Sequence, residues 1–214
     1  MKLVTKLVAA GALLAAVNTN AAIIDFGSAA WTPAADGQNS HTVSYSFGNV
    51  TATAGPGNAK LFANDPVDGL GVKGGEGDEI DLAESITLTF QNALNVVGIK
   101  LTDLFPRNHA SDGQPTDGND PVNGEVASLS FYLAGNLVTS LQIYGLNSVG
   151  ANGEQAFNVP GAGLYADKIV FSAGGAYNEY SIKSVTVPEP GIFALLGLGL
   201  MGLGLSRRRQ AQKS

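Results

Sequence analysis

The chain has 214 residues, enough for one domain of moderate size once both apolar ends are set aside. It contains no cysteine, so an exported form would depend on a buried core or bound ions rather than on disulfides. All 18 acidic residues but only six basic ones lie between Asp25 and Glu189, which gives this region a net charge of −12. Such a charge argues against nucleic acid as a partner, because binding it requires cations that neutralise phosphates. Cations or neutral sugars are more suitable partners for such a charge.

Residues 1–21 have the pattern of a secretory signal peptide. Lys2 and Lys6 form a positively charged start, and Leu7–Val17 supplies an apolar run of the right length. Thr19 and Ala21 are small residues at the −3 and −1 positions of a cleavage after Ala21, with cleavage after Ala22 as a close alternative. The other interpretation is an uncleaved anchor, for which the apolar run is short.

From Ile23 onward, short alternating runs of β-branched and aromatic residues predict strands, and no stretch has a sustained helical period. Ser85–Phe90 alternates most clearly, and a turn is predicted at Asn92–Asn95. Gly135-Asn136 predicts a two-residue hairpin turn. The predicted strands are Ile23–Phe26, Thr42–Phe47, Val50–Ala54, Lys60–Phe62, Ser85–Phe90, Val97–Leu101, Ala127–Leu133, Leu137–Tyr144, Lys168–Phe171 and Ile182–Val187.

About ten short strands joined by turn-rich loops, without helices for parallel crossovers, predict an all-β fold. We expect an antiparallel β-sandwich or jelly roll over residues 22–186. Two long loops of low apolar content interrupt it, Asn64–Glu84 and Pro106–Gly124, and loops of this length are either functional or mobile.

The first long loop carries five carboxylates within nine residues, directly before the strand Ser85–Phe90. Carboxylates this close repel one another unless they are solvated or bridged by a cation, and Ca²⁺ takes six to eight oxygen ligands in flexible geometry. One hypothesis is therefore a structural Ca²⁺ site. The alternative is a solvated acidic loop that protects a sheet edge. The candidate ligands are Glu76, Asp78, Glu79, Asp81 and Glu84.

The second long loop carries Asp112, Asp117, Asn119 and Asp120. Their spacing does not match an EF-hand loop, which needs alternating ligands, a central glycine and a terminal glutamate. A mobile loop is favoured here, with a weak ion site or a variable binding loop as the alternative.

The residues needed for nucleophilic catalysis are scarce. Only His41 and His109 could serve as a base, and neither accompanies a Gly-x-Ser-x-Gly elbow. The two histidines are also too far apart in sequence, without thiolates, to indicate zinc. A pair of carboxylates could hydrolyse a glycosidic bond, but with 18 acids the sequence cannot select one. We therefore expect a protein that is not an enzyme.

Exposed aromatic rings would favour a sugar-binding face, although each ring could equally pack in the core or against a neighbouring strand. Tyr177 and Tyr180 are the best placed, because their loop is rich in glycine. The candidates are Trp31, Tyr45, Tyr132, Tyr144, Tyr165, Tyr177 and Tyr180.

The C-terminal segment 187–214 has three parts in a fixed order. Pro188-Glu189-Pro190 comes first, and prolines hold the backbone before them extended. An uncharged run, 191–206, follows; it is short for a membrane span but can cross a locally thinned bilayer. Arg207, Arg208 and Arg209 then favour the cytoplasmic side. An ordinary membrane anchor is the alternative to a segment that is removed.

These three parts resemble the PEP-CTERM sorting signal. The resemblance covers residues 187–209 and implies recognition by an exosortase, removal of the tail, and export to the cell surface or the exopolysaccharide matrix. The sequence thus predicts an exported structural or adhesive protein, with Ca²⁺ as its only expected ion and the membrane as a transient partner. Alternatives are a carbohydrate-binding module, which would make polysaccharide a partner, and a secreted glycoside hydrolase.

Overall fold

The computed structural model describes residues 21–74, 78–81, 83–106, 124–145, 152–173 and 178–188. The prediction of an all-β fold is confirmed, since the regular elements in these ranges are strands. In this part of the chain no helix has the length and hydrophobicity needed to cross a membrane. The strands are β1 (Ala21–Asp25), β2 (Ser40–Tyr45), β3 (Gly48–Gly55), β4 (Lys60–Phe62), β5 (Gly71–Lys73), β6 (Ser85–Val96), β7 (Gly98–Thr102), β8 (Val126–Leu133), β9 (Asn136–Tyr144), β10 (Gln155–Asn158), β11 (Leu164–Ala173) and β12 (Ser181–Pro188).

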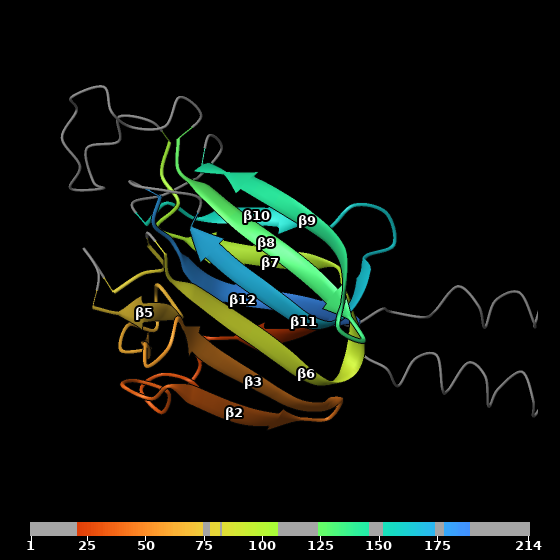
Figure 1. The fold of residues 1–214 in the computed structure, drawn as a ribbon, viewed down its shortest axis with the longest axis horizontal. Coiled ribbons are helices and arrows are strands. Elements are labelled where there is room, and N and C mark those ends of the chain that lie inside the picture. The colour runs from red at the N-terminus through yellow and green to blue at the C-terminus, as the bar shows by residue number, and fades with distance from the viewer. Residues whose placement is uncertain are drawn as a thin grey trace, which may run out of the picture. The chain divides into compact units, whose positions relative to one another are not determined.

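Two sheets form a sandwich within the compact unit 23–187. The larger sheet has six strands in the order β2-β3-β6-β11-β8-β9, and the smaller has four in the order β1-β12-β7-β10. In Figure 1 the larger sheet lies in front of the smaller one. Every strand pair with a defined register is antiparallel. A third pair, β4 and β5, lies beside the sandwich.

The core follows from the alternation of side chains along each strand. In β6, Ile86, Leu88 and Phe90 are buried while the intervening threonines are less so. Phe131 in β8 and Phe171 in β11 are likewise fully buried. A strand with a period of two places every second side chain on one face, so these residues fill the space between the sheets.

The two predicted turns, at Asn92–Asn95 and at Gly135-Asn136, were wrong in position. Asn92–Asn95 is not a turn, because β6 continues to Val96, whose partner in β11 is Leu164. The hairpin turn between β8 and β9 consists of Ala134 and Gly135, both with positive φ, rather than Gly135 and Asn136. Positive φ at both central positions is typical of a type I′ turn, which matches the twist of the flanking strands.

Candidate functional site

Four segments from distant parts of the chain meet at one end of the sandwich. They are 63–70, 78–84, 102–105 and 178–181. Backbone hydrogen bonds hold them together: Leu70 N donates to Ile182 O at 3.0 Å, and Ile80 N donates to Tyr180 O at 2.9 Å. The Thr102 hydroxyl donates to Asp68 O at 2.5 Å. This arrangement brings acidic residues of all four segments to one end, which we call the acidic end.

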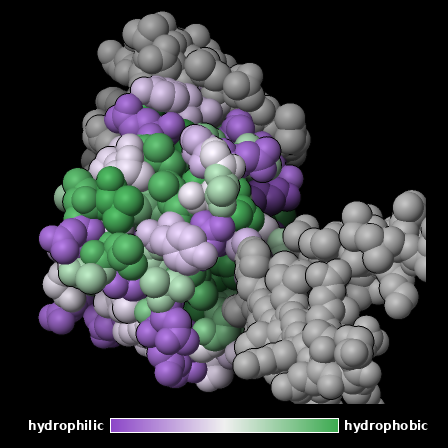
Figure 2. All heavy atoms as spheres, turned by 90° about the vertical axis from the view of Figure 1, so that its right-hand side faces the viewer, coloured by the Kyte–Doolittle hydropathy of each residue, from purple (hydrophilic) through white to green (hydrophobic). Residues whose placement is uncertain are grey.

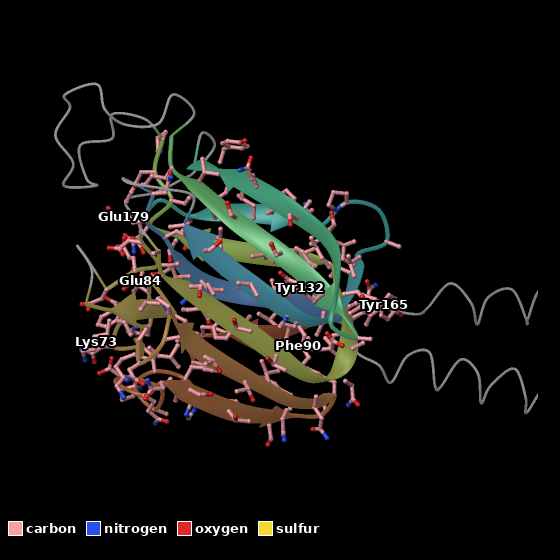
Figure 3. The ribbon with its side chains drawn as sticks, in the orientation of Figure 1. Lys73, Glu84, Phe90, Tyr132, Tyr165 and Glu179 are labelled. Atoms are coloured by element: carbon pink, nitrogen blue, oxygen red, sulfur yellow. The ribbon has the colours of Figure 1, made fainter. Side chains whose placement is uncertain are left out.

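Glu79 lies at the centre of the acidic end. It is half-buried, and burial raises its pKa to about 9, with further contributions from the negative charges of Asp103, Glu179, Asp68 and Asp81. A carboxyl group with a raised pKa stays protonated at neutral pH unless a nearby cation stabilises its ionised form. We call Asp68, Glu79, Asp103 and Glu179 the carboxylate cluster. Figure 3 shows Glu179 at the same end of the sandwich as Glu84 and Lys73.

Asp103 follows β7 with a φ of 58°, a backbone conformation that aspartate tolerates better than most residues. Its backbone N donates to Asn152 O at 2.8 Å, which fixes the turn. Burial raises its pKa to about 7, with Asp68 as the next contribution. Its Oδ2 atom is buried without a hydrogen-bond partner. An unpaired buried carboxylate oxygen is costly, and either a proton or a cation would lower that cost.

Lys183 is a cation whose charge acts on this cluster. Its charge lowers the pKa of Asp68 against the larger effects of burial and Asp65, which raise it. The ammonium is also engaged elsewhere: it donates to Pro66 O and lies 3.8 Å from Asp25 Oδ1. The Lys183 ammonium is therefore shared between this cluster and other partners, and Lys73, at the same end (Figure 3), is paired with Asp36 at 3.1 Å.

Asp81 and Glu84 form a separate local turn. Asp81 is 6% exposed, and its backbone N donates to Glu84 Oε2 at 3.3 Å, while Glu84 N donates to Asp81 O at 2.7 Å. The pKa of Glu84 is raised to about 7, first by burial and then by its proximity to Asp81. The turn formed by this pair directly precedes β6, which begins at Ser85.

The five predicted Ca²⁺ ligands are therefore divided among different surroundings. Glu79 lies in the carboxylate cluster, Asp81 and Glu84 form their own turn, and Asp78 is exposed. Glu76 lies outside the described residues. Over the ranges that the structure covers, no three His, Asp or Glu side chains are arranged so that they could hold a metal ion.

Sequence reasoning missed Asp68, Asp103 and Glu179 as members of the cluster. They are isolated acids in three separate loops, and only the pairing of β7 with β12 and of Leu70 with Ile182 brings those loops together. No local spacing in the sequence marks them. The second predicted acidic loop, with Asp112, Asp117, Asn119 and Asp120, lies outside the described residues.

The aromatic candidates differ in exposure. Trp31 and Tyr180 are fully buried; the indole Nε1 donates to Tyr45 Oη at 2.8 Å, and Tyr180 Oη donates to Ser172 O at 3.1 Å. Neither ring can stack on a sugar in this conformation. Tyr165 is 60% exposed. The Lys168 ammonium lies over the Tyr132 ring, 4.0 Å from the ring centroid.

Tyr144 is 37% exposed, and its hydroxyl bonds Gln142 Oε1 at 2.8 Å. Tyr177 lies outside the described residues. Of the two histidines, His41 packs edge-on against Trp31 and its Nε2 lies 3.0 Å from Ala30 O, while His109 is outside the described residues. The described histidine therefore packs within the protein.

The sorting residues are only partly described. Pro188 is the last residue of β12, and Val187 before it is 1% exposed. Glu189, Pro190, Arg207, Arg208 and Arg209 lie outside the described residues.

Comparison with known protein families identifies this segment. The family model of the PEP-CTERM protein-sorting motif matches residues 186–209. The match begins inside β12, so its first three residues are part of that strand. No curated protein sequence is significantly similar to the chain.

Solved structures give only distant similarities. A CBM32 domain of a family 31 glycoside hydrolase from Clostridium perfringens is 12% identical, with a TM-score of 0.34, over 64% of this chain and 94% of that one. The lectin domain of lectinolysin is 14% identical, with a TM-score of 0.33, over 79% and 92%. The xylan-binding module CBM86 from Roseburia intestinalis is 15% identical, with a TM-score of 0.34, over 72% and 98%. Similarity at this level carries no argument about function.

Proposed function

Because residues 186–209 carry a PEP-CTERM sorting motif, we propose that the chain is a non-enzymatic protein that is exported across the inner membrane and sorted to the cell surface or extracellular matrix. An exosortase-type enzyme in the membrane would remove its tail. The observation that carries this proposal is the motif itself, which begins in the last strand of a β-sandwich.

Each part of the tail has a physical role in this account. The strip Pro188-Glu189-Pro190 would be recognised, since prolines keep its backbone extended and available to an enzyme. The uncharged run 191–206 would hold the chain in the bilayer before processing. The arginines 207–209 would remain in the cytoplasm, because basic residues near a span end resist translocation.

Replacing Pro188, Glu189 and Pro190 together with alanine should leave the tail attached. The reason is that the extended, acidic strip is lost while the uncharged run and the arginines are kept. Intact mass measurement of the chain from a cell that processes the wild type will show whether residues 191–214 are still present.

Gln210→Ala is the matched control, because Gln210 lies outside the matched residues 186–209. We expect this variant to be processed like the wild type. Normal removal of the tail from the triple-alanine variant would refute the strip as the recognition element, while leaving the assignment of export intact.

The sandwich itself would serve a structural or adhesive role at the surface. Burial of Trp31 and Tyr180 removes two of the aromatic rings that a carbohydrate-binding module would use, which favours this role over the alternative. Tyr144 and Tyr165 are exposed and could contact a polysaccharide from the strand surface.

The acidic end is also where a structural Ca²⁺ would act. The support is the raised pKa of Glu79 and Asp103 together with the unpartnered Oδ2 atom of Asp103, since oxygen ligands of this kind are those that Ca²⁺ prefers. Side chains of the cluster would have to turn toward one ion. When bound, the ion would supply positive charge that neutralises the cluster and fixes the four loops.

Addition of Ca²⁺ should raise the thermal midpoint of the calcium-free chain, and a chelator should reverse the rise. A ligand that binds only the folded state stabilises it by mass action, by about 2.7 kcal/mol at 100 times its dissociation constant. Differential scanning fluorimetry will check this. Asp103→Asn should abolish the shift. An unchanged midpoint across a millimolar calcium series would dismiss the ion.

A further inference from the structure

The end of the sandwich opposite the acidic end carries no charged residue in any of its turns. These turns and adjoining strand ends are residues 45–49, 91–98, 133–139 and 158–165, and none contains Asp, Glu, Lys or Arg. Hydrogen bonds join them: Asn92 Nδ2 donates to Phe47 O at 3.1 Å, and Val159 N donates to Val97 O at 3.0 Å. We call this surface the uncharged end. It lies at the right in Figure 1.

In the described strands that adjoin these turns, the nearest charged residues along the chain are Lys100 in β7 and Asp167 and Lys168 in β11. All three are engaged by the protein, and Lys100 forms an ion pair with Glu154 at 2.7 Å. Asp167 Oδ2 accepts a hydrogen bond from Ala134 N at 2.7 Å, and the Lys168 ammonium lies over the ring of Tyr132. The sandwich is thus electrically polarised, with the carboxylate cluster at one end and turns without charge at the other.

The uncharged end also gathers the exposed apolar side chains. Seven large hydrophobic side chains are exposed among the described residues, and four of them lie in the ranges that form this end. Figure 2 views the molecule from this side and shows hydrophobic patches among hydrophilic ones. Clustered apolar exposure of this kind is typical of an interaction surface. The four are Leu133, Leu137, Val138 and Tyr165.

The chain leaves the sandwich at this same end. Val97 N donates to Thr186 O at 3.0 Å, so the last residues of β12 lie beside the turn between β6 and β7. The uncharged run 191–206 begins three positions after Pro188, the last residue of β12. Three residues span at most about 11 Å when fully extended. If this run lies in a bilayer, the uncharged end is tethered close to the bilayer surface.

We propose that the uncharged end rests on the phospholipid surface while the tail is in the membrane, with Leu133, Leu137, Val138 and Tyr165 contacting the headgroup region. This inference depends on the proposed membrane role of the tail. Apolar side chains gain by leaving water, and tyrosine is enriched at membrane interfaces. The acidic end, at the opposite end of the sandwich, then points away from the bilayer. The contact would orient the strip 188–190 for an enzyme embedded in the same bilayer.

A tryptophan placed on the proposed contact tests this orientation. The chain has a single tryptophan, Trp31, which is fully buried and therefore gives a constant background. The full chain with Leu137→Trp would be reconstituted into phosphatidylcholine vesicles with and without brominated acyl chains. Val67→Trp is the matched control, because Val67 is similarly exposed (49% against 57% for Leu137) but lies at the acidic end. Tyr165→Trp provides a second probe if Leu137→Trp does not fold.

We expect the emission of the Leu137→Trp variant to shift to shorter wavelength on vesicles and to be quenched by the brominated lipid, while that of Val67→Trp is unaffected. Equal quenching of both, or of neither, in a chain that floats with the vesicles would overturn the inference and leave the role of the tail intact. A chain that does not float with vesicles would overturn both. A concentration-dependent shift without vesicles would assign the patch to a second copy of the chain and also overturn it.

Discussion

Glu79→Gln should raise the free energy of unfolding of the calcium-free protein at pH 8, and it should flatten the dependence of that free energy on pH. The wild-type glutamate has its pKa raised from 4.5 to about 9 by burial and by the surrounding carboxylates Asp103, Glu179, Asp68 and Asp81. Glutamine has nearly the same shape and never ionises, so it removes the cost of keeping residue 79 protonated in the folded state and leaves no cavity.

The sign follows from proton linkage. Between pH 4.5 and about 9 the folded state keeps a proton on Glu79 that the unfolded state has lost, so the free energy of unfolding falls as pH rises. At 1.36 kcal/mol per pH unit, Glu79 alone would account for on the order of 3 kcal/mol between pH 5 and pH 7.5. Asp103 adds to the same slope up to about pH 7. Stability should therefore be greatest in mildly acidic solution.

Urea titrations at several pH values between 5 and 9, in the presence of a chelator, will measure this slope. Asp78→Asn is the matched control, since Asp78 lies in the same loop but is exposed, and it should leave the slope unchanged. A Glu79→Gln variant whose stability falls with pH as steeply as that of the wild type would show that Glu79 is not buried among like charges.

Trp31→Ala should lower the free energy of unfolding by about 3–5 kcal/mol, the range for truncation of a large buried aromatic side chain. Trp31 is fully buried, packs edge-on against Phe26 with ring centroids 4.9 Å apart, and donates to Tyr45 Oη. The substitution leaves a cavity and removes the indole N–H that donates to Tyr45 Oη. Chemical denaturation at one pH will measure the loss.

Tyr165→Ala is the matched control for an exposed aromatic ring. Because Tyr165 is 60% exposed, we expect a change within about 0.5 kcal/mol. The pair of variants also separates the two interpretations of the aromatic residues. A loss below about 1 kcal/mol for Trp31→Ala would contradict its place in the core and return it to the candidates for sugar contact.

The sequence predicted the fold class because alternation is a local property. Ser85–Phe90 and Ala127–Leu133 show the period of two directly, and both lie in long strands. It missed β5, which lies inside the stretch 64–84 that was expected to be a loop, and β10, which has only four residues. It ended β6 too early, because the polar Asn92 and Asn95 look like a turn until β11 is placed beside them.

The candidate site was predicted less well for a similar reason. Glu79 was found because it lies in a dense run of carboxylates. Asp68, Asp103 and Glu179 come from loops far apart in the chain, and only sheet pairing brings them to one end. The sorting motif was identified fully, since its order of strip, uncharged run and arginines is contained in one continuous stretch.

The central claim is that this chain is exported and loses its C-terminal tail. The most direct test is the intact mass of the natural protein recovered from the cell envelope and the medium. The account predicts a chain that lacks residues 1–21 and ends near the strip 188–190. An intact chain in the cytosol, from Met1 to Ser214, would contradict it.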